Sequence, residues 1–124
     1  MVNEFFLKAE ENLQGAQLLC DARLYNAATN RAYYAAFQAA LAMIQMKGLQ
    51  ANTDHAKVQA TFNGEVIRRS KHISVSFKRY LLTMQDARNL ADYYPTMLSR
   101  QKAEKQLLMA KEFINVIRME LEQQ

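Results

Sequence analysis

The chain has 124 residues, which is the usual size of one domain and allows a single core to bury about two thirds of the unfolded surface. Half of the residues are hydrophobic, but only three glycines and one proline are present, which argues against a many-stranded sheet and favours helices. Sixteen basic and twelve acidic residues give a net charge of +4, which is compatible with a polyanionic partner without requiring one.

Two long helices are predicted in the first part of the chain. Apolar residues recur at steps of three and four and predict a first helix over residues 3–22. A second helix is predicted from Asn26, a favoured N-cap residue, to Lys47, where Gly48 provides a stop signal. The second helix is rich in alanine and apolar on most sides, a pattern typical of the central helix of a bundle.

A third, shorter helix is predicted after Asp54. Its inward residues would be Val58, Phe62 and Val66, although Gly64 weakens the helical preference of the segment.

Two further helices follow. Ser74 or Ser76 is expected to cap a fourth helix, which must end before Pro95. Its predicted apolar stripe consists of Tyr80, Met84, Ala87, Ala91 and Tyr94. The last helix, residues 99–120, has the most regular period. Because the connections between the long helices are short, we expect residues 1–124 to form one all-α domain, an up-and-down four-helix bundle with one additional short helix.

Several kinds of site and segment are not expected. Cys20 is the only cysteine, so neither an intrachain disulfide nor a thiolate zinc site is expected. No His, Cys or carboxylate cluster has metal-ligand spacing and no glycine-rich phosphate loop is present, so we expect no metal and no cofactor. The most apolar stretch, residues 32–46, is too short to span a membrane, and the N-terminus does not read as a signal peptide. We expect a cytoplasmic protein that is not bound to a membrane.

A polar seam runs along the second helix. Arg31, Gln38 and Gln45 are spaced by seven and share one face with Ala35 and Ala42. This seam either faces solvent or forms a groove or dimer surface, in which two central helices meet.

Arg88 in the fourth helix borders the predicted apolar stripe, on the flank of Phe77 and Leu81, and Asp92 is four residues further along. The two residues form either a structural ion pair or part of a phosphate clamp, since a guanidinium matches the geometry of a phosphate. We expect Arg88 and Arg31 to open on one concavity.

Residues 28–37 (ATNRAYYAAF), His55 and residues 88–93 (RNLADY) together resemble signatures of the HEPN family. The likeness covers nearly the whole chain and is similar to the small stand-alone branch found beside minimal nucleotidyltransferases. It implies a helical bundle that works as a homodimer, a nucleotidyltransferase partner, and RNA or a nucleotide as ligand.

The resemblance also implies a partial catalytic motif. Ribonucleases of the family use an arginine, a polar residue and a histidine four to six residues after the arginine. Arg88 and Asn89 match the first half, but Tyr93 or Tyr94 stands near the place of the histidine. A tyrosine transfers protons poorly near neutral pH.

Two histidines stand elsewhere in the chain. His55 and His72 lie in or near predicted connections, where capping or exposed roles are common, so we do not expect either to be catalytic. In many relatives a histidine also follows the phenylalanine of the second helix, but here Gln38 occupies that place.

The expected ligand-binding residues are Arg31, Tyr34, Gln38, Arg88, Asp92 and Tyr93. Basic residues at positions 68, 69, 71, 78 and 79 form either a solvated face or a contact for an RNA backbone. We favour a non-catalytic binding module of a toxin–antitoxin type pair. An active metal-independent ribonuclease and a purely structural helical partner are the alternatives.

The resemblance also implies a role for a tyrosine, because in related modules a tyrosine near the motif receives nucleotide groups from the partner transferase. On the helical wheel Tyr94 falls on the apolar stripe and Tyr93 on the opposite side, so Tyr93 is expected to be the more accessible. Alternatively, both rings only close the end of the bundle.

Overall fold

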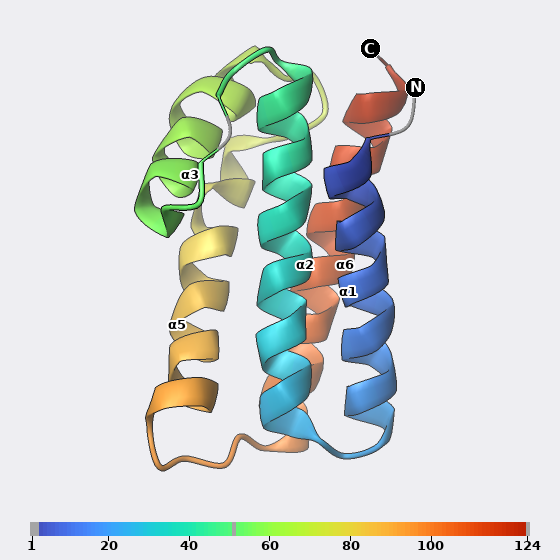
Figure 1. Cartoon of the computed structure of the whole chain (residues 1–124), viewed down its shortest axis with the longest axis vertical. Coiled ribbons are helices and arrows are strands. Elements are labelled where there is room, and N and C mark those ends of the chain that lie inside the picture. Colours follow the sequence, from blue (N-terminus) through green and yellow to red (C-terminus); the bar gives the residue numbers. More distant parts are fainter. Residues whose placement is uncertain (1–2, 51, 124) are drawn as a thin grey trace.

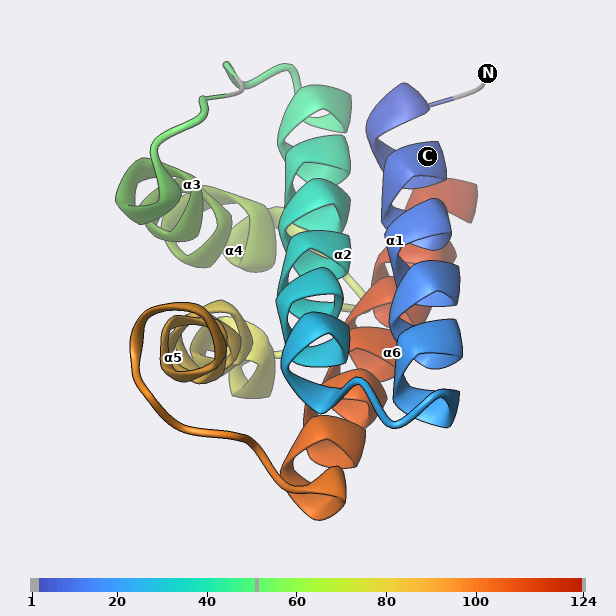
Figure 2. The ribbon, with the colours of Figure 1, turned by 60° about the horizontal axis from the view of Figure 1, so that its bottom comes forward.

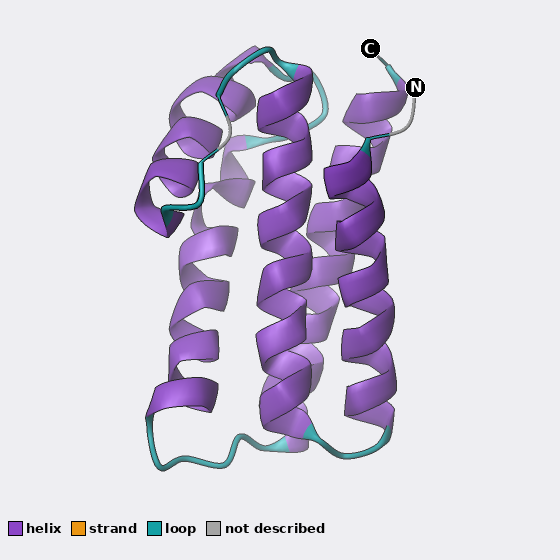
Figure 3. Ribbon diagram, in the orientation of Figure 1, coloured by secondary structure: helices purple, strands orange, loops and turns teal. Residues whose placement is uncertain are grey.

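The computed structural model describes residues 3–50 and 52–123, which contain helices and no strand (Figures 1 and 3). The long helices are α1 (Glu4–Asp21), α2 (Tyr25–Met46), α5 (Tyr80–Tyr93) and α6 (Arg100–Glu122). A shorter helical segment comprises α3 (His55–Thr61), a π-helical turn (Phe62–Val66) and α4 (Ile67–Arg69), and a 3-10 turn (Val75–Arg79) leads into α5. The predicted four-helix bundle with an additional short helix is therefore confirmed.

Helix α2 is the centre of the bundle. It packs against α1 and α6 on one side and against α5 and the α3–α4 segment on the other (Figures 1 and 2). Ala32, Ala36, Ala39 and Ala40 of α2 are buried. Their small side chains let the neighbouring helices approach closely, as the composition of this helix predicts.

The predicted helix ends are set by local chemistry. Asn3 accepts a hydrogen bond from the Phe6 amide and caps α1, and Ser99 does the same for α6 through the Lys102 amide. Gly48 has a φ of +74°, a left-handed conformation that terminates α2 and favours glycine.

The start of α2 differs from the prediction. The helix begins at Tyr25, and Asn26 lies inside its first turn rather than at the N-cap. The Asn26 side chain instead donates to the Thr96 carbonyl at 3.2 Å and accepts from the Leu98 amide at 2.9 Å. Asn26 thus holds the connection between α5 and α6, a long-range use of its polarity that local sequence rules do not reveal.

The third predicted helix is present despite its glycine. Asp54 caps it by accepting from the Lys57 amide, and Val58, Phe62 and Val66 are fully buried as predicted. Gly64 lies within the π-helical turn, so the segment continues with one wider turn instead of breaking.

The inward face of α5 matches the predicted stripe only in part, because Met84 is buried and Tyr80 packs against the core but other members are less covered. The helix ends before Pro95 as expected, but its buried residues are Leu81, Met84 and Arg88. Tyr94 lies outside the helix and is 59% exposed, which contradicts its predicted place on the apolar stripe. Because α5 meets the bundle chiefly through α2, a narrow strip on the Arg88 side is covered and the rest of the helix is open.

The predicted serine cap of the fourth helix is only partly right. Ser74 precedes the 3-10 turn, but its hydroxyl bonds to that of Ser76 at 2.6 Å and caps no backbone amide of the turn. The 3-10 turn then runs directly into α5 at Tyr80.

Among the helices of residues 3–50 and 52–123, none combines the length and the hydropathy that crossing a bilayer requires.

Candidate functional site

Arg88 is a nearly buried cation between α5 and α2. Arg88 is only 7% exposed. Its Nη1 donates to the hydroxyl oxygens of Tyr34 at 3.2 Å and Tyr93 at 3.3 Å. The carboxylate oxygen that pairs with it, Asp92 Oδ2, lies 3.8 Å from Nη1, and the buried Nε has no hydrogen-bond partner among the residues that the structure describes. Such a charge is weakly compensated, because taking a guanidinium out of water requires close ionic partners and satisfied donors.

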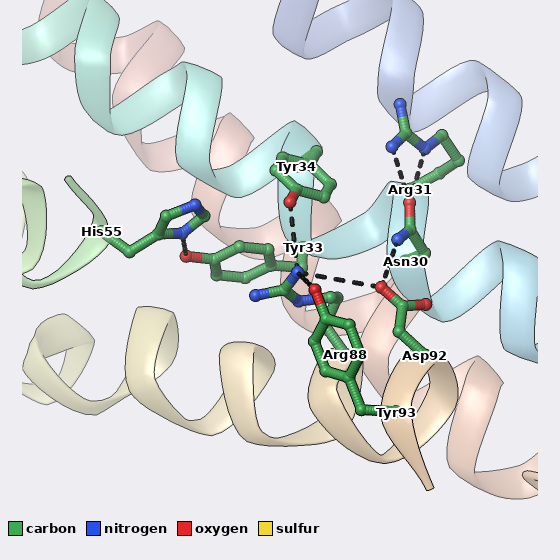
Figure 4. A network of polar contacts seen from close by, with 8 residues as sticks. All are labelled: Asn30, Arg31, Tyr33, Tyr34, His55, Arg88, Asp92 and Tyr93. Carbon is green, nitrogen blue, oxygen red and sulfur yellow. Dashed lines mark hydrogen bonds and ion pairs between the residues drawn. The ribbon is translucent and has the colours of Figure 1, made fainter. Parts of the chain in front are cut away.

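Figure 4 shows the polar contacts around this residue, which we call the Arg88 network. Its members are Asn30, Arg31, Tyr33, Tyr34, His55, Arg88, Asp92 and Tyr93. They come from α2, α3 and α5, three helices that the sequence separates and the bundle brings together.

Three aromatic rings surround the Arg88 guanidinium. The guanidinium carbon lies 5.4 Å from the ring centre of Tyr33, 5.6 Å from that of Tyr34 and 5.4 Å from that of Tyr93. The negative faces of aromatic rings attract a cation, so they offset part of the cost of burying it. They do not supply the full counter-charge that an anion would bring.

A second cation is joined to this centre through an asparagine. Arg31 donates to Asn30 Oδ1 from Nε at 2.8 Å and from Nη2 at 2.6 Å, and Asn30 Nδ2 donates to Asp92 Oδ2 at 2.8 Å. The Arg31 guanidinium also lies 5.0 Å from the centre of the Tyr34 ring, which therefore contacts both arginines. The predicted reach of Arg88 to Asp92 is confirmed.

That Arg31 and Arg88 open on one concavity stays a prediction. Arg31 donates from Nη1 to Asn12 Oδ1 at 3.0 Å and lines a shallow groove along α1 with Lys8 and Leu18, among others. Arg88 does not line this groove, because its guanidinium lies under the tyrosine rings on the α5 side of α2. The guanidinium groups of Arg31 and Arg88 thus both lie beside the Tyr34 ring.

The polar seam of α2 is not an open dimer surface. Ala35 and Ala42 are fully buried within the protomer, and the Ala42 carbonyl accepts from Asn3 Nδ2 of the α1 N-cap at 3.2 Å. Gln38 is half-buried, and its buried Oε1 accepts no hydrogen bond from the described part of the chain, whereas Gln45 is exposed. The seam prediction is wrong for the two alanines, because they are covered within the protomer, and a helical wheel does not show which neighbour covers a face.

His55 is the functional candidate that sequence reasoning set aside. It is the first residue of α3, half-buried, with its ring centre 4.5 Å from that of Phe37 and its Nδ1 2.5 Å from the hydroxyl of Tyr33. Burial, with help from the positive Arg88, lowers the pKa of His55, while Asp54 opposes the shift. Burial also raises the pKa of Tyr33 to about 12, so its phenol is neutral at physiological pH.

A signal for this position was present in the sequence. His55 stands three residues before Val58 and continues the inward series through Phe62 at steps of three and four. The predicted exposed or capping role is therefore wrong for His55, whereas His72 is exposed as expected.

The remaining predicted residues lie around the network or away from it. Asn89 is half-buried next to Arg88 on α5. Arg68 and Arg69 each bond to Glu65 at 2.9 Å, which neutralises part of the basic region. The other basic side chains of that region, Lys71, Lys78 and Arg79, are exposed.

Comparison with known proteins is consistent with the helical architecture. Residues 2–120 match the family model of the HEPN domain. A protein of Methanocaldococcus jannaschii named "Putative toxin" is 32% identical over 115 residues, which are 93% of this chain and 84% of that protein. A UPF0332 protein of Gloeobacter violaceus is 27% identical over 104 residues, which are 84% of this chain and 81% of that protein. The family match spans every helix that contributes to the Arg88 network.

Proposed function

Because the chain belongs to the HEPN family, we propose that it is a toxin-like module that binds RNA or a nucleotide through a phosphate group at Arg88. The relative with toxin in its name supports the toxin-like role. One observation carries the ligand assignment: Arg88 is 93% removed from solvent, yet the carboxylate of Asp92, which pairs with it, is as far away as 3.8 Å. A phosphate would supply the missing counter-charge.

The groups around Arg88 suit a phosphate better than an uncharged, apolar ligand. The hydroxyls of Tyr34 and Tyr93 already accept from Nη1, so each retains an O–H that can donate to a phosphate oxygen. Arg31 adds a second positive charge beside the Tyr34 ring. Two cations and two phenol donors around one point form the kind of convergent polar set that binds an anion.

The Tyr93 ring offers a surface for a nucleobase. It is 70% exposed although its hydroxyl contacts Arg88, so the ring extends from the phosphate site into solvent. Bases stack on such rings with little dependence on sequence. We assign Gln38 and Asn89 as additional polar contacts on the two flanking helices, and Asp92 as the residue that orients Arg88 and Asn30.

We propose two partners for this module, a second copy of the chain and a minimal nucleotidyltransferase. Since Ala35 and Ala42 of the α2 seam are buried in the protomer, we place the homodimer contact at the open side of α5, which carries the exposed Leu82, Leu90 and Tyr93. Sedimentation at micromolar concentration tests this contact: Leu82→Asp should convert the dimer to a monomer. A wild-type chain that sediments only as a monomer would remove the homodimer from the proposal.

The central experiment measures RNA binding by fluorescence anisotropy, with a labelled mixed-sequence RNA. Arg88→Met should weaken binding at least about tenfold and reduce the dependence of affinity on salt by roughly one phosphate contact. Because methionine replaces a buried charge with an apolar chain of similar length, the free energy of unfolding should be kept or raised. If Arg88 formed only a structural ion pair, Arg88→Met would lower the free energy of unfolding and leave the RNA affinity unchanged.

Arg118→Met is the matched control. Arg118 also stacks on a ring, that of Phe6, and pairs with Glu10 at 3.1 Å, but it lies between α6 and α1, away from the network. Equal effects of the two substitutions on affinity would show that only net charge matters and would contradict a site at Arg88. Loss of stability in Arg88→Met without loss of binding would favour the purely structural alternative.

A further inference from the structure

A cavity lies at the end of the bundle where α1 ends and where α2 and α6 begin (Figures 1 and 2). Its volume is about 440 Å³, which is within the range of cavities that hold small molecules. It is lined by side chains of α1 and α6, by Arg23 of the connection after α1, and by Tyr25, the first residue of α2. No member of the Arg88 network except this shared helix α2 takes part, so the cavity is a separate place on the molecule.

Charged side chains of both signs line the cavity. Three are basic and two are acidic: Arg23, Arg100, Lys111, Asp21 and Glu104. Glu104 Oε1 accepts from Arg100 Nε at 2.5 Å, and Asp21 Oδ1 accepts at 2.9 Å from the side-chain amide four residues earlier. Within residues 3–50 and 52–123, neither Arg23 nor Lys111 forms an ion pair. The lining therefore has an excess of positive charge, and two of its cations lack a carboxylate partner.

Arg23 holds a backbone conformation that favours glycine. Its φ is +66°, in the left-handed region. Its amide donates to the Cys20 carbonyl at 3.0 Å, and the Leu24 amide donates to the Leu19 carbonyl at 2.9 Å. The same pair of bonds ends α2, where the left-handed residue is Gly48, the usual choice for this motif. An arginine in so unfavourable a place indicates that its side chain has a use there.

Helix α2 begins beside the cavity without a capping side chain. Its N-cap is Leu24, which makes no side-chain cap bond, and its first turn contains no acidic residue. Helix α1, by contrast, has Asn3 as its cap and Glu4 in its first turn. The first amides of a helix lack acceptors within the helix and carry partial positive charge, so an anion next to Tyr25 would stabilise this end.

We propose that this cavity binds a small phosphate ester, whose phosphate is held by Arg23 and Lys111 at the start of α2. Leu107 and Leu108, which also line the cavity, contact the organic part of the ligand. A phosphate fits better than a single carboxylate, because it offers a second negative charge and more acceptor oxygens to two cations and a helix end. The site does not depend on the proposed phosphate site at Arg88.

Cys20 reports on the occupancy of the cavity. It is the only cysteine of the chain, and it lines the cavity. Burial raises the pKa of its thiol, with help from Glu104 and Asp21. Arg100 and Lys111 oppose the shift, so charges of the cavity act directly on this sulfur. A bound phosphate would cover the sulfur and add negative charge beside it, and both effects slow the reaction of the thiol with a disulfide reagent.

The test follows the reaction of Cys20 in the full chain with an aromatic disulfide reagent at mildly alkaline pH. Phenyl phosphate at millimolar concentration should slow this reaction several-fold. Phenol, which lacks the phosphate, and benzoate, which has one negative charge, should slow it far less. Calorimetric titration of phenyl phosphate measures the same affinity without the thiol.

Arg23→Gly is the sharpest substitution. Glycine adopts the left-handed conformation freely, so the Tm should be kept or raised, while the affinity for phenyl phosphate should fall about tenfold or more. Lys111→Gln should weaken binding in the same way. Lys102→Gln is the matched control, because Lys102 is an exposed lysine of the same helix that does not line the cavity, and it should bind normally.

The two phosphate sites are separated by exchanging the variants. Arg88→Met should lose RNA binding and keep the protection of Cys20 by phenyl phosphate, and Arg23→Gly should do the opposite. The cavity proposal is overturned by a wild-type chain that does not bind phenyl phosphate, by binding that persists in both Arg23→Gly and Lys111→Gln, or by equal binding of benzoate. It is also overturned if the mixed-sequence RNA protects Cys20 as well as the ester does, since the cavity would then belong to an RNA surface.

Discussion

Asn30 on α2 donates from Nδ2 to Asp92 Oδ2 on α5 at 2.8 Å, and the same oxygen is the one that lies 3.8 Å from Arg88. The carboxylate is thus bonded more closely to a neutral amide than to the buried cation. This arrangement holds Asp92 beside Arg88 without closing an ion pair at hydrogen-bond distance. The positive charge of Arg88 therefore remains available to an anion.

Asp92→Asn should strengthen RNA binding a few-fold, since it removes a negative charge next to the proposed phosphate and lets the side chain keep its bond to Asn30. Anisotropy titrations of wild type and variant at two salt concentrations give the measurement. Asp86→Asn, an exposed change on the same helix, is the control for net charge. Weaker binding by Asp92→Asn would mean that the carboxylate itself contacts the ligand.

Glu120→Ala should lower the free energy of unfolding by about 2–4 kcal/mol. Glu120 is 2% exposed, and its carboxylate accepts from the Lys71 amide at 3.1 Å and the His72 amide at 3.2 Å, with Lys47 Nζ at 3.8 Å. The substitution leaves these donors without their acceptor and thus loosens the connection that leads to α5.

Chemical denaturation measures this loss, with Glu122→Ala as the control because Glu122 is an exposed glutamate of the same helix. A Glu120→Ala protein as stable as that control would show that the connection does not depend on the buried carboxylate.

Lowering the pH should destabilise the fold through His55. Its pKa in the folded chain is lowered from 6.5, so the folded state prefers the neutral ring, and this stabilising contribution is complete above pH 6.5. It is lost as the pH falls from 6.5 through the folded-state pKa. Denaturation curves at several pH values should show a smaller decline for His55→Asn than for wild type.

His72→Asn serves as the comparison for this pH series, because His72 is exposed and should leave the decline as it is in wild type. An identical decline in wild type and His55→Asn would assign the pH dependence to groups other than His55.

Tyr93 should be the residue that a cognate nucleotidyltransferase modifies. Its ring is 70% exposed, against 59% for Tyr94, and its hydroxyl lies 3.3 Å from Arg88, a cation that favours binding of a nucleotide phosphate nearby. Incubation with transferase and ATP, followed by mass spectrometry of peptides, should locate the adduct on Tyr93. The adduct should weaken RNA binding, because it occupies the Arg88 site.

Tyr93→Phe and Tyr94→Phe form the matched pair for this experiment: the first should abolish the adduct and the second should retain it. An unmodified wild-type chain would leave Tyr93 with its role as a ligand contact alone.

The sequence by itself determined the helices and most of their ends. Asn3, Asp54 and Ser99 cap helices by bonding to amides three residues away, and Gly48 and Pro95 stop helices through their own backbone constraints. These interactions are local, so no knowledge of the fold is needed to predict them. The motif around Arg88 and its pairing with Asp92 are local in the same sense.

Only the tertiary structure decided which face of each helix is covered and which residues meet. The period of α5 fixes the angles between its side chains, but the position of α2 turned the Arg88 face inward and left Tyr94 exposed. His55 reached the network because α3 packs beside α2 and places its first residue against Tyr33, 22 positions earlier in the chain. Contacts between distant segments depend on how whole helices pack, and no local pattern records that packing.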